Sequence, residues 1–332
     1  MLSTSDVWGR RAFLKSTAGM ALASALPMNA WHGGSAKPLN GLFPIGQTPF
    51  KGDKLDLDCL AAEVSFVNRG RVHGFAWPQI ASGWSTLSET ERMDGAEAIV
   101  SAGKGGKTAL VIGVQDKAGS VEQAAKYAKH AAKLGADAII SLPPPDVTDA
   151  RTIIDYYQKL GMATDLPMFV QTIGDFSIDS IVEMFRTIPT MKVVKDEAGN
   201  PLERVRTIRE RTANKLEVFS GKGVRTMIEE MELGFTGHCP TTGLADLYQS
   251  AWDLWHTGKR AEAFDMFGRV LAFDSIPGSG SYVLVARGVF KEATTYRSMP
   301  GMGDGHAPKL DEAGKKLVRE ALDGYLKPYL RG

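Results

Sequence analysis

The chain has 332 residues, of which 43% are hydrophobic and 23% are charged, so it is long enough to bury one large core. Its 39 basic and 38 acidic residues nearly cancel, so we expect no nucleic-acid partner and no anionic membrane partner. The two cysteines, Cys59 and Cys239, are too few for a disulfide framework and lack metal-ligand spacing with the six histidines. No metal site is therefore expected, and a single bridge between the two cysteines stays an alternative.

The N-terminal residues 1–36 have the features of a targeting segment. Arg10 and Arg11 precede a run of small and apolar residues over 16–26, and Ala23-Ser24-Ala25 forms a small-x-small cleavage site, which is the order of a twin-arginine export signal. The apolar run is shorter than the about 20 residues that a membrane span needs. We expect a signal peptide and linker over 1–36, export to the periplasm and no stable membrane insertion. An N-terminal amphipathic helix of the mature fold is the alternative.

From Gly41 onward, short apolar runs alternate with segments of helical spacing, and the alternation comes out near eight. The expected strands cover 42–48, 73–78, 109–114, 138–143, 167–173, 191–197, 216–220 and 235–240. The expected helices cover 57–68, 88–102, 120–134, 150–164, 178–187, 202–212, 223–233 and 244–257. Brief apolar strands are typical of buried parallel sheets. The pattern predicts an α/β fold with a (β/α)8 TIM barrel over 37–260, and a doubly wound open sheet is the alternative.

After residue 260 the strand pattern stops. Helical spacing covers 261–273, 281–294 and 310–330, which predicts an appended C-terminal helical region over 261–332.

The strand expected over 191–197 carries a lysine near its end. Side chains alternate across a strand, so Lys195 and Glu197 should share one face while Asp196 lies on the other. In a barrel the carboxyl ends of the strands form the active site, which places Lys195 at the mouth. A desolvated lysine loses its proton more easily, and a neutral amine is a nucleophile toward ketones. The sequence thus predicts a nucleophilic Lys195, with a strand-end lysine paired to a neighbouring carboxylate as the alternative.

Five short motifs lie at strand boundaries or at a helix start. They are Gln47-Thr48-Pro49-Phe50, Leu87-Ser88-Glu89-Thr90-Glu91-Arg92, Leu142-Pro143-Pro144, Val194-Lys195-Asp196-Glu197-Ala198-Gly199 and Leu233-Gly234-Phe235-Thr236-Gly237. In order and spacing they resemble the dihydrodipicolinate synthase / N-acetylneuraminate lyase family. The resemblance implies a class I lyase on a (β/α)8 barrel, commonly a homotetramer. It also implies a Schiff base between Lys195 and the ketone of pyruvate or another 2-oxo acid.

The chain departs from this family at positions that handle protons. The family usually has Gly-Thr-Thr-Gly-Glu after the second strand, where this chain has Gln79-Ile80-Ala81-Ser82-Gly83. The family's tyrosine at the end of the fifth strand falls on Gln171, and the tyrosine after the fourth strand falls on Pro145 or Asp146. Glutamine cannot donate and recover a proton as a phenol can. The tyrosine-centred relay is therefore missing.

A branch of 2-keto-3-deoxy-sugar-acid dehydratases is also similar to this chain. It has glutamine at the position of Gln171, an acid two residues after the lysine, as Glu197 is here, and a sequence like Gly258-Lys259-Arg260-Ala261-Glu262-Ala263. The resemblance implies that the substrate is a 2-keto-3-deoxy sugar acid, which is dehydrated or cleaved after Lys195 attacks its ketone. Condensation of pyruvate, as in the synthases, and a catalytically inactive 2-oxo-acid-binding barrel are the alternatives.

The expected site residues fall into a catalytic and a substrate-binding group. The expected catalytic residues are Lys195, Glu197 as the base, and Gln171. The expected substrate-binding residues are Thr48, Ser82, Ile80, Ala81, Lys222 and His238, the last two because they follow the seventh strand and end the eighth. For Lys222 an exposed lysine in a turn is the alternative. The reaction is expected to need no cofactor, and the expected partner is a small-molecule 2-oxo acid.

Overall fold

The computed structural model describes residues 37–221, 225–297 and 310–331. The predicted signal peptide over 1–36 and the predicted substrate-binding Lys222 lie outside the described residues.

Within the described residues, eight parallel strands form one sheet, in the order β1, β10, β9, β8, β7, β6, β5, β4. They are β1 (Gly41–Leu42), β4 (Gly74–Trp77), β5 (Ala109–Gly113), β6 (Ala138–Ser141), β7 (Met168–Thr172), β8 (Met191–Asp196), β9 (Glu217–Ser220) and β10 (Gly237–His238). The two edges meet just beyond β1, where the Gly46 N–H donates to the Ala76 carbonyl at 2.9 Å and the Ala76 N–H donates to the Pro44 carbonyl at 3.0 Å. The predicted barrel is confirmed, and the open-sheet alternative is wrong.

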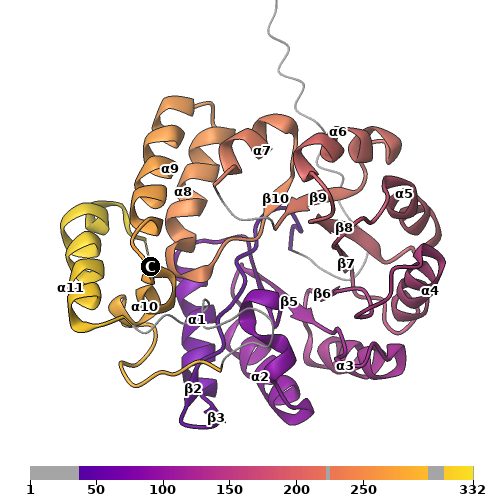
Figure 1. Cartoon of the computed structure of the whole chain (residues 1–332), viewed down its shortest axis with the longest axis horizontal. Coiled ribbons are helices and arrows are strands. Elements are labelled where there is room, and N and C mark those ends of the chain that lie inside the picture. The colour runs from indigo at the N-terminus through magenta and orange to yellow at the C-terminus, as the bar shows by residue number, and fades with distance from the viewer. Residues whose placement is uncertain (1–36, 222–224, 298–309, 332) are drawn as a thin grey trace, which may run out of the picture. The chain divides into compact units, whose positions relative to one another are not determined.

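Eight helices follow the barrel strands in the described part of the chain, and Figure 1 shows them on the outside of the strands. They are α1 (Leu57–Arg69), α2 (Glu89–Ala102), α3 (Val121–Leu134), α4 (Ala150–Gly161), α5 (Ile178–Thr187), α6 (Pro201–Arg211), α7 (Met227–Leu233) and α8 (Ala245–His256). Ser88, Ser120 and Ser177 each accept a hydrogen bond from a backbone N–H of the first turn. These capping contacts satisfy N–H groups that have no partner inside the helix, which is why α2, α3 and α5 begin where the sequence predicts.

The described elements after β10 are helical. A short helix (η3, Thr242–Leu244) leads into α8, and α9 (Arg260–Asp274), α10 (Ser279–Ala286) and α11 (Glu312–Ala321) follow, with a further turn over Leu322–Tyr329. A buried ion pair ties this region to α8, because both nitrogens of the Arg287 fork bind the Asp246 carboxylate, at 2.7 and 2.8 Å. The Arg331 N–H also donates to Asp246, at 2.7 Å. The predicted C-terminal helices are therefore present and packed on the barrel helices.

One pair of strands was not expected from the sequence. Strands β2 (Phe50–Lys51) and β3 (Lys54–Leu55) form an antiparallel hairpin that begins at the last residue of the first motif. Thr295 pairs with Phe50 on its other side, through backbone bonds of 2.9 and 3.0 Å. Two-residue strands are too short to show an alternating pattern, so periodicity could not reveal them.

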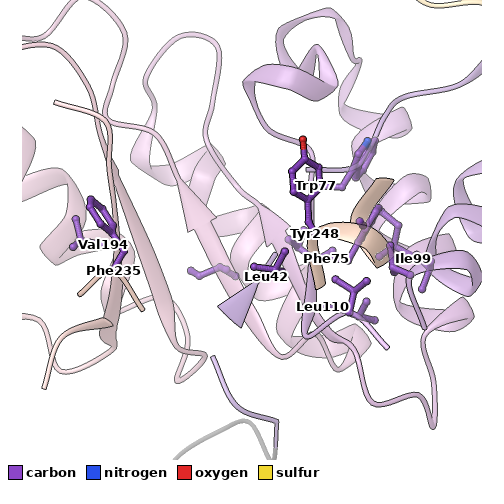
Figure 2. Packing of buried hydrophobic residues seen from close by; sticks show 14 of the residues in the cluster. Leu42, Phe75, Trp77, Ile99, Leu110, Val194, Phe235 and Tyr248 are labelled. Atoms are coloured by element: carbon purple, nitrogen blue, oxygen red, sulfur yellow. The ribbon is translucent and has the colours of Figure 1, made fainter. Parts of the chain in front are cut away.

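Two apolar layers cover the two faces of the sheet. The outer layer lies between strands and helices, and Figure 2 shows part of it, with Leu42, Phe75 and Leu110 of the strands and Tyr248 of α8. The inner layer fills the barrel and consists of Phe43, Ile45, Ala76, Ala109, Val111, Ala138, Ile140, Phe169, Val193 and Phe219. Its three phenylalanine rings contact one another with centroids 5.2 to 5.6 Å apart, so the barrel interior is a packed core and not a pore.

None of the described helices is long and apolar enough to cross a membrane.

Helix α1 buries one carboxyl group completely. Both oxygens of Glu63 accept from the Gln47 N–H, at 3.0 and 3.1 Å, next to the first motif. Burial raises the pKa of Glu63 from 4.5 to about 8, although the bonds from Gln47 and Thr242 act in the opposite direction. Glu63 is therefore protonated in the folded chain at neutral pH.

This raised pKa predicts how stability changes with pH. Between pH 4.5 and about pH 8 the folded state holds a proton on Glu63 that the unfolded state has lost, so this group's contribution to the free energy of unfolding decreases as the pH rises. Glu63→Gln should remove that decrease while keeping an acceptor for the Gln47 N–H. The measurement is urea unfolding at about pH 5, 6.5 and 8. The free energy of unfolding of the variant should increase relative to that of the unmutated protein as the pH rises. The exposed Glu97→Gln on α2 is the control, and a difference that is constant with pH would contradict this assignment.

Candidate active site

Lys195 lies at the carboxyl end of β8 on the inner face of the barrel. It follows Val193 of the inner layer by two residues, and only 4% of it is exposed. Its Nζ lies 3.2 Å from Oε2 of Glu197. Asp196 points the other way, where Thr172 donates to it at 2.6 Å and Arg204 at 2.8 Å. The side chains thus alternate as predicted, with an amine and a carboxylate together at the mouth.

Gln171 of β7 completes this group. It is the register partner of Lys195 in the neighbouring strand, and its Nε2 donates to Oε2 of Glu197. Its Oε1 is buried and has no hydrogen-bond partner in the described part of the chain. The three predicted catalytic residues therefore lie together. Oε2 of Glu197 contacts both the Lys195 amine and the Gln171 amide nitrogen, and Oε1 of Gln171 is the acceptor left unpaired beside them.

The backbone of Gly221 forms the wall on the other side of Lys195. A Cβ atom at Gly221 would lie 2.1 Å from Cε of Lys195 and 2.4 Å from Oε1 of Glu197, which is far inside van der Waals contact. Gly221 directly follows β9, the strand that pairs with β8. Only glycine leaves room for both side chains in these positions.

Cys239, which follows His238 at the end of the predicted eighth strand and was expected to shape the pocket, lies near Lys195 and Glu197. It packs against the inner layer, burial raises its pKa to about 12, and the charges of Lys195 and Glu197 act on it with opposite signs. Both cysteines are free thiols, so the bridge with Cys59 is not formed. Alternation along β10 could have placed Cys239 on the inner face.

Thr48 and Ser82, two of the predicted substrate-binding residues, hydrogen-bond with protein groups. The Thr48 hydroxyl donates to the Ser82 carbonyl at 2.6 Å and accepts from Trp77 Nε1 at 2.9 Å. The Ser82 hydroxyl donates to the Gly46 carbonyl at 2.6 Å and accepts from the Gln79 N–H at 3.0 Å. These bonds join the end of the first barrel segment to the loop after β4, so both hydroxyls hold the mouth in shape.

Ile80 and Ala81 form the start of a short helical turn in that loop (η1, Ile80–Ser82). Ala81 packs against the inner layer, whereas Ile80 is half-buried. Ala81 thus lies on the same side of the sheet as Val193. The role of both residues in binding substrate stays a prediction.

His238 is not brought to Lys195. Its Nδ1 lies 2.7 Å from Oε2 of Glu230 on α7, and its ring meets Trp252 of α8 edge to face at 5.7 Å. The side chain therefore points away from the barrel interior, toward the outer helices. Within the described residues, no group of three or more His, Cys, Asp or Glu side chains could hold a metal ion.

The close approach at Gly221 gives a prediction that separates activity from stability. Gly221→Ala should place a methyl group where Cε of Lys195 now lies, and a flexible lysine can yield, so the chain should fold. The displaced amine should then lose most of its reactivity toward a ketone, by about a hundredfold. The measurement is the rate of covalent adduct formation with pyruvate, with Gly268→Ala as the control because its Cβ would meet nothing within 4 Å. Equal rates in the two variants would contradict the proposed wall.

The chain is similar in sequence to known proteins over most of the barrel. The model of the dihydrodipicolinate synthetase family matches residues 38–274. The 4-hydroxy-tetrahydrodipicolinate synthase of Magnetococcus marinus is 24% identical over 244 residues, which cover 71% of this chain and 82% of the relative. A probable 2-dehydro-3-deoxy-D-pentonate aldolase of Escherichia coli is 23% identical over 252 residues, which cover 72% and 82%. An uncharacterised DapA-like lyase of Halobacterium salinarum is 30% identical over 183 residues, but these cover only 52% and 59%.

Solved structures share the fold. The N-acetylneuraminate lyase of Mycoplasma synoviae superposes with a TM-score of 0.73 at 19% identity, covering 86% of this chain and 98% of that one. A prophage protein of the dihydrodipicolinic acid synthase family from Escherichia coli, solved in complex with pyruvate, superposes with a TM-score of 0.70 at 17% identity, with the same coverage. The family match includes Lys195 and Glu197 and spans most of the chain. The chain therefore belongs to the dihydrodipicolinate synthetase family, whose members are class I Schiff-base lyases.

Proposed function

We propose that this chain is a Schiff-base lyase for a 2-oxo acid, that its substrate is a 2-keto-3-deoxy sugar acid, and that Lys195 is the nucleophile. The observation that carries the proposal is the contact among the Lys195 amine, the Glu197 carboxylate and the Gln171 amide on the inner face of the barrel. The Lys195 amine lies above the apolar inner layer, with a proton acceptor 3.2 Å away. Burial and a neighbouring base are the two conditions under which an amine becomes a nucleophile toward a ketone.

The reaction follows from these positions. The Glu197 carboxylate takes a proton from the Lys195 ammonium, and the neutral amine attacks the C2 carbonyl of the substrate. The carbinolamine takes this proton back from Glu197 as its hydroxyl leaves as water, which gives a protonated imine between Nζ and C2 and a free Glu197 carboxylate. In dehydration, Glu197 then removes a proton from C3, the imine accepts that electron pair, and the C4 hydroxyl leaves with the proton as water. In cleavage, Glu197 instead removes the proton of the C4 hydroxyl, so the bond between C3 and C4 breaks, its electron pair passes to the imine, an aldehyde departs and C3 takes up the proton. In both routes water finally hydrolyses the imine, which frees Lys195 and releases the 2-oxo acid product.

Gln171 supports a hydroxylated substrate. Its amide nitrogen is used by Glu197, which leaves the buried, unpaired Oε1 to accept a hydrogen bond. A buried acceptor without a partner costs about 1 to 3 kcal/mol, and a substrate hydroxyl would remove that cost. The similarity to the probable pentonate aldolase agrees with a sugar-acid substrate.

A second candidate is the condensation of pyruvate with an aldehyde, as in the synthases. It is favoured by the similarity to the 4-hydroxy-tetrahydrodipicolinate synthase, of which the match covers 82%. A condensation that relies on a tyrosine to give and retake protons would lose that step here, because Gln171 can only form hydrogen bonds. We therefore place condensation second.

Oligomerisation and export belong to the same proposal. We propose a homotetramer, which sedimentation in solution would test, and export through the twin-arginine segment around Arg10 and Arg11.

The role of Glu197 can be tested by separating adduct formation from turnover. Glu197→Gln should still form a pyruvate adduct at Lys195, but more slowly because solvent must then take the ammonium proton, and should lower turnover of the sugar acid by roughly 10²- to 10⁴-fold, the usual contribution of a general base. The test is a panel of 2-keto-3-deoxy sugar acids scored for release of pyruvate and for the dehydrated 2-oxo acid, with Glu203→Gln on α6 as the control. Full turnover by Glu197→Gln would remove Glu197 from the mechanism. Efficient dihydrodipicolinate synthesis by the unmutated protein would favour the second candidate instead.

The export proposal has its own test. Replacing Arg10 and Arg11 together with lysine should keep the protein in the cytoplasm, because twin-arginine signals depend on that pair. Cell fractionation and intact mass should find the unmutated protein outside the cytoplasm and shortened near Ala25. A full-length cytoplasmic protein in both cases would contradict the signal peptide.

A further inference from the structure

A second buried carboxylate lies directly behind the wall of the site. Glu230 of α7 is 2% exposed and contacts three different elements. Ser220 at the end of β9 donates to its Oε1 at 2.9 Å, and Thr226, just before α7, donates to the same oxygen at 2.6 Å. Its Oε2 lies 2.7 Å from His238 Nδ1 at the end of β10.

This carboxylate is charged in the folded protein. Burial acts to raise the pKa of Glu230, but the contacts with His238, Thr226 and Ser220 together hold it below its ordinary value. Removing any one partner of a buried charge is costly, because the charge keeps its desolvation penalty and loses a bond. The three contacts should therefore act as a unit that holds three chain segments in fixed positions.

Two of these segments continue directly into the site. Ser220 is followed by Gly221, whose backbone is the wall against Lys195 and Glu197. His238 is followed by Cys239, which packs on the inner layer. The ends of β9 and β10 are also hydrogen-bonded to each other, since the Cys239 N–H donates to the Ser220 carbonyl at 3.0 Å. Ser220 and His238 thus face outward and contact Glu230. The residues that follow them, Gly221 and Cys239, face the interior near Lys195.

We propose that Glu230 is a positioning residue: through Ser220, Thr226 and His238 it fixes the carboxyl ends of β9 and β10, and so keeps the Gly221 wall and Cys239 in register with Lys195. Within the described residues Glu230 bonds Ser220, Thr226 and His238 and neither Lys195 nor Glu197, so its effect on catalysis passes through the backbone. The catalytic part of this inference depends on the proposed role of Lys195, whereas the structural part does not.

The test removes one contact at a time, because loss of the whole carboxylate could prevent folding. Ser220→Ala and Thr226→Val each remove one donor to Glu230, and Thr226→Ser restores the hydroxyl. Ser141→Ala is the matched control, since Ser141 is a buried serine at the end of β6 whose hydroxyl bonds Tyr156 and the Leu142 carbonyl and not Glu230. All four variants are made in the full chain and checked for folding by thermal unfolding.

Two measurements decide the outcome. The first is the saturating rate constant for the pyruvate adduct on Lys195, trapped with borohydride. It should fall about tenfold in Ser220→Ala and Thr226→Val and stay near the unmutated value in Ser141→Ala and Thr226→Ser. The pyruvate concentration at half saturation should change little, because binding groups are untouched. The second is amide hydrogen exchange of 217–221 and 237–240, which should speed up in the first two variants only.

The two measurements separate the two proposals. If the unmutated protein forms no adduct on Lys195, the proposed function fails, and hydrogen exchange alone decides whether Glu230 holds these strand ends. Exchange in Ser220→Ala and Thr226→Val that matches Ser141→Ala would overturn the positioning role. So would faster exchange with an unchanged adduct rate, since the wall would then be irrelevant to Lys195.

Discussion

The burial of the Lys195 amine above the packed inner layer is the constraint on which the rest of the site depends. The rings of Phe43, Phe169 and Phe219 close the barrel beneath Lys195, with centroids 5.2 to 5.6 Å apart. A charge taken out of water in this way is costly unless partners surround it. Glu197 supplies the partner at 3.2 Å, and Gln171 holds that carboxylate in turn. The polar groups of the site are thus a consequence of placing the lysine at the top of the core.

Buried carboxylates on the outer face of the sheet are likewise surrounded by hydrogen-bond partners. Asp196 is completely buried and is bound by Thr172 and Arg204, and Glu230 is bound by Ser220, Thr226 and His238. In each case a residue at a strand end faces the helices while its neighbour in the chain faces the interior. Because neighbouring residues share one backbone, fixing the outer side chain also fixes the inner one. Polar contacts on the outer face thus lie one residue away from the side chains that face the interior near Lys195.

Much of this arrangement could be predicted from the sequence. The alternation of short apolar runs with helical spacing located eight strands and their helices, and the period of two along 191–197 put Lys195 and Glu197 on one face and Asp196 on the other. Pairing between distant segments could not be predicted in this way. The partners of Glu230 come from two strands and a loop, and no periodicity connects Ser220 with His238. Likewise, nothing in the first motif shows that the Thr48 hydroxyl bonds the Ser82 carbonyl, at 2.6 Å.

In the proposed reaction the Lys195 amine forms a covalent imine with a 2-oxo acid. Borohydride reduction of the full-length protein in the presence of pyruvate, followed by peptide mapping, measures this step. We expect a single irreversible adduct on Lys195 and none in Lys195→Arg. An adduct on Lys192 of the same strand or on Lys222, or no covalent mass increase at all, would contradict it.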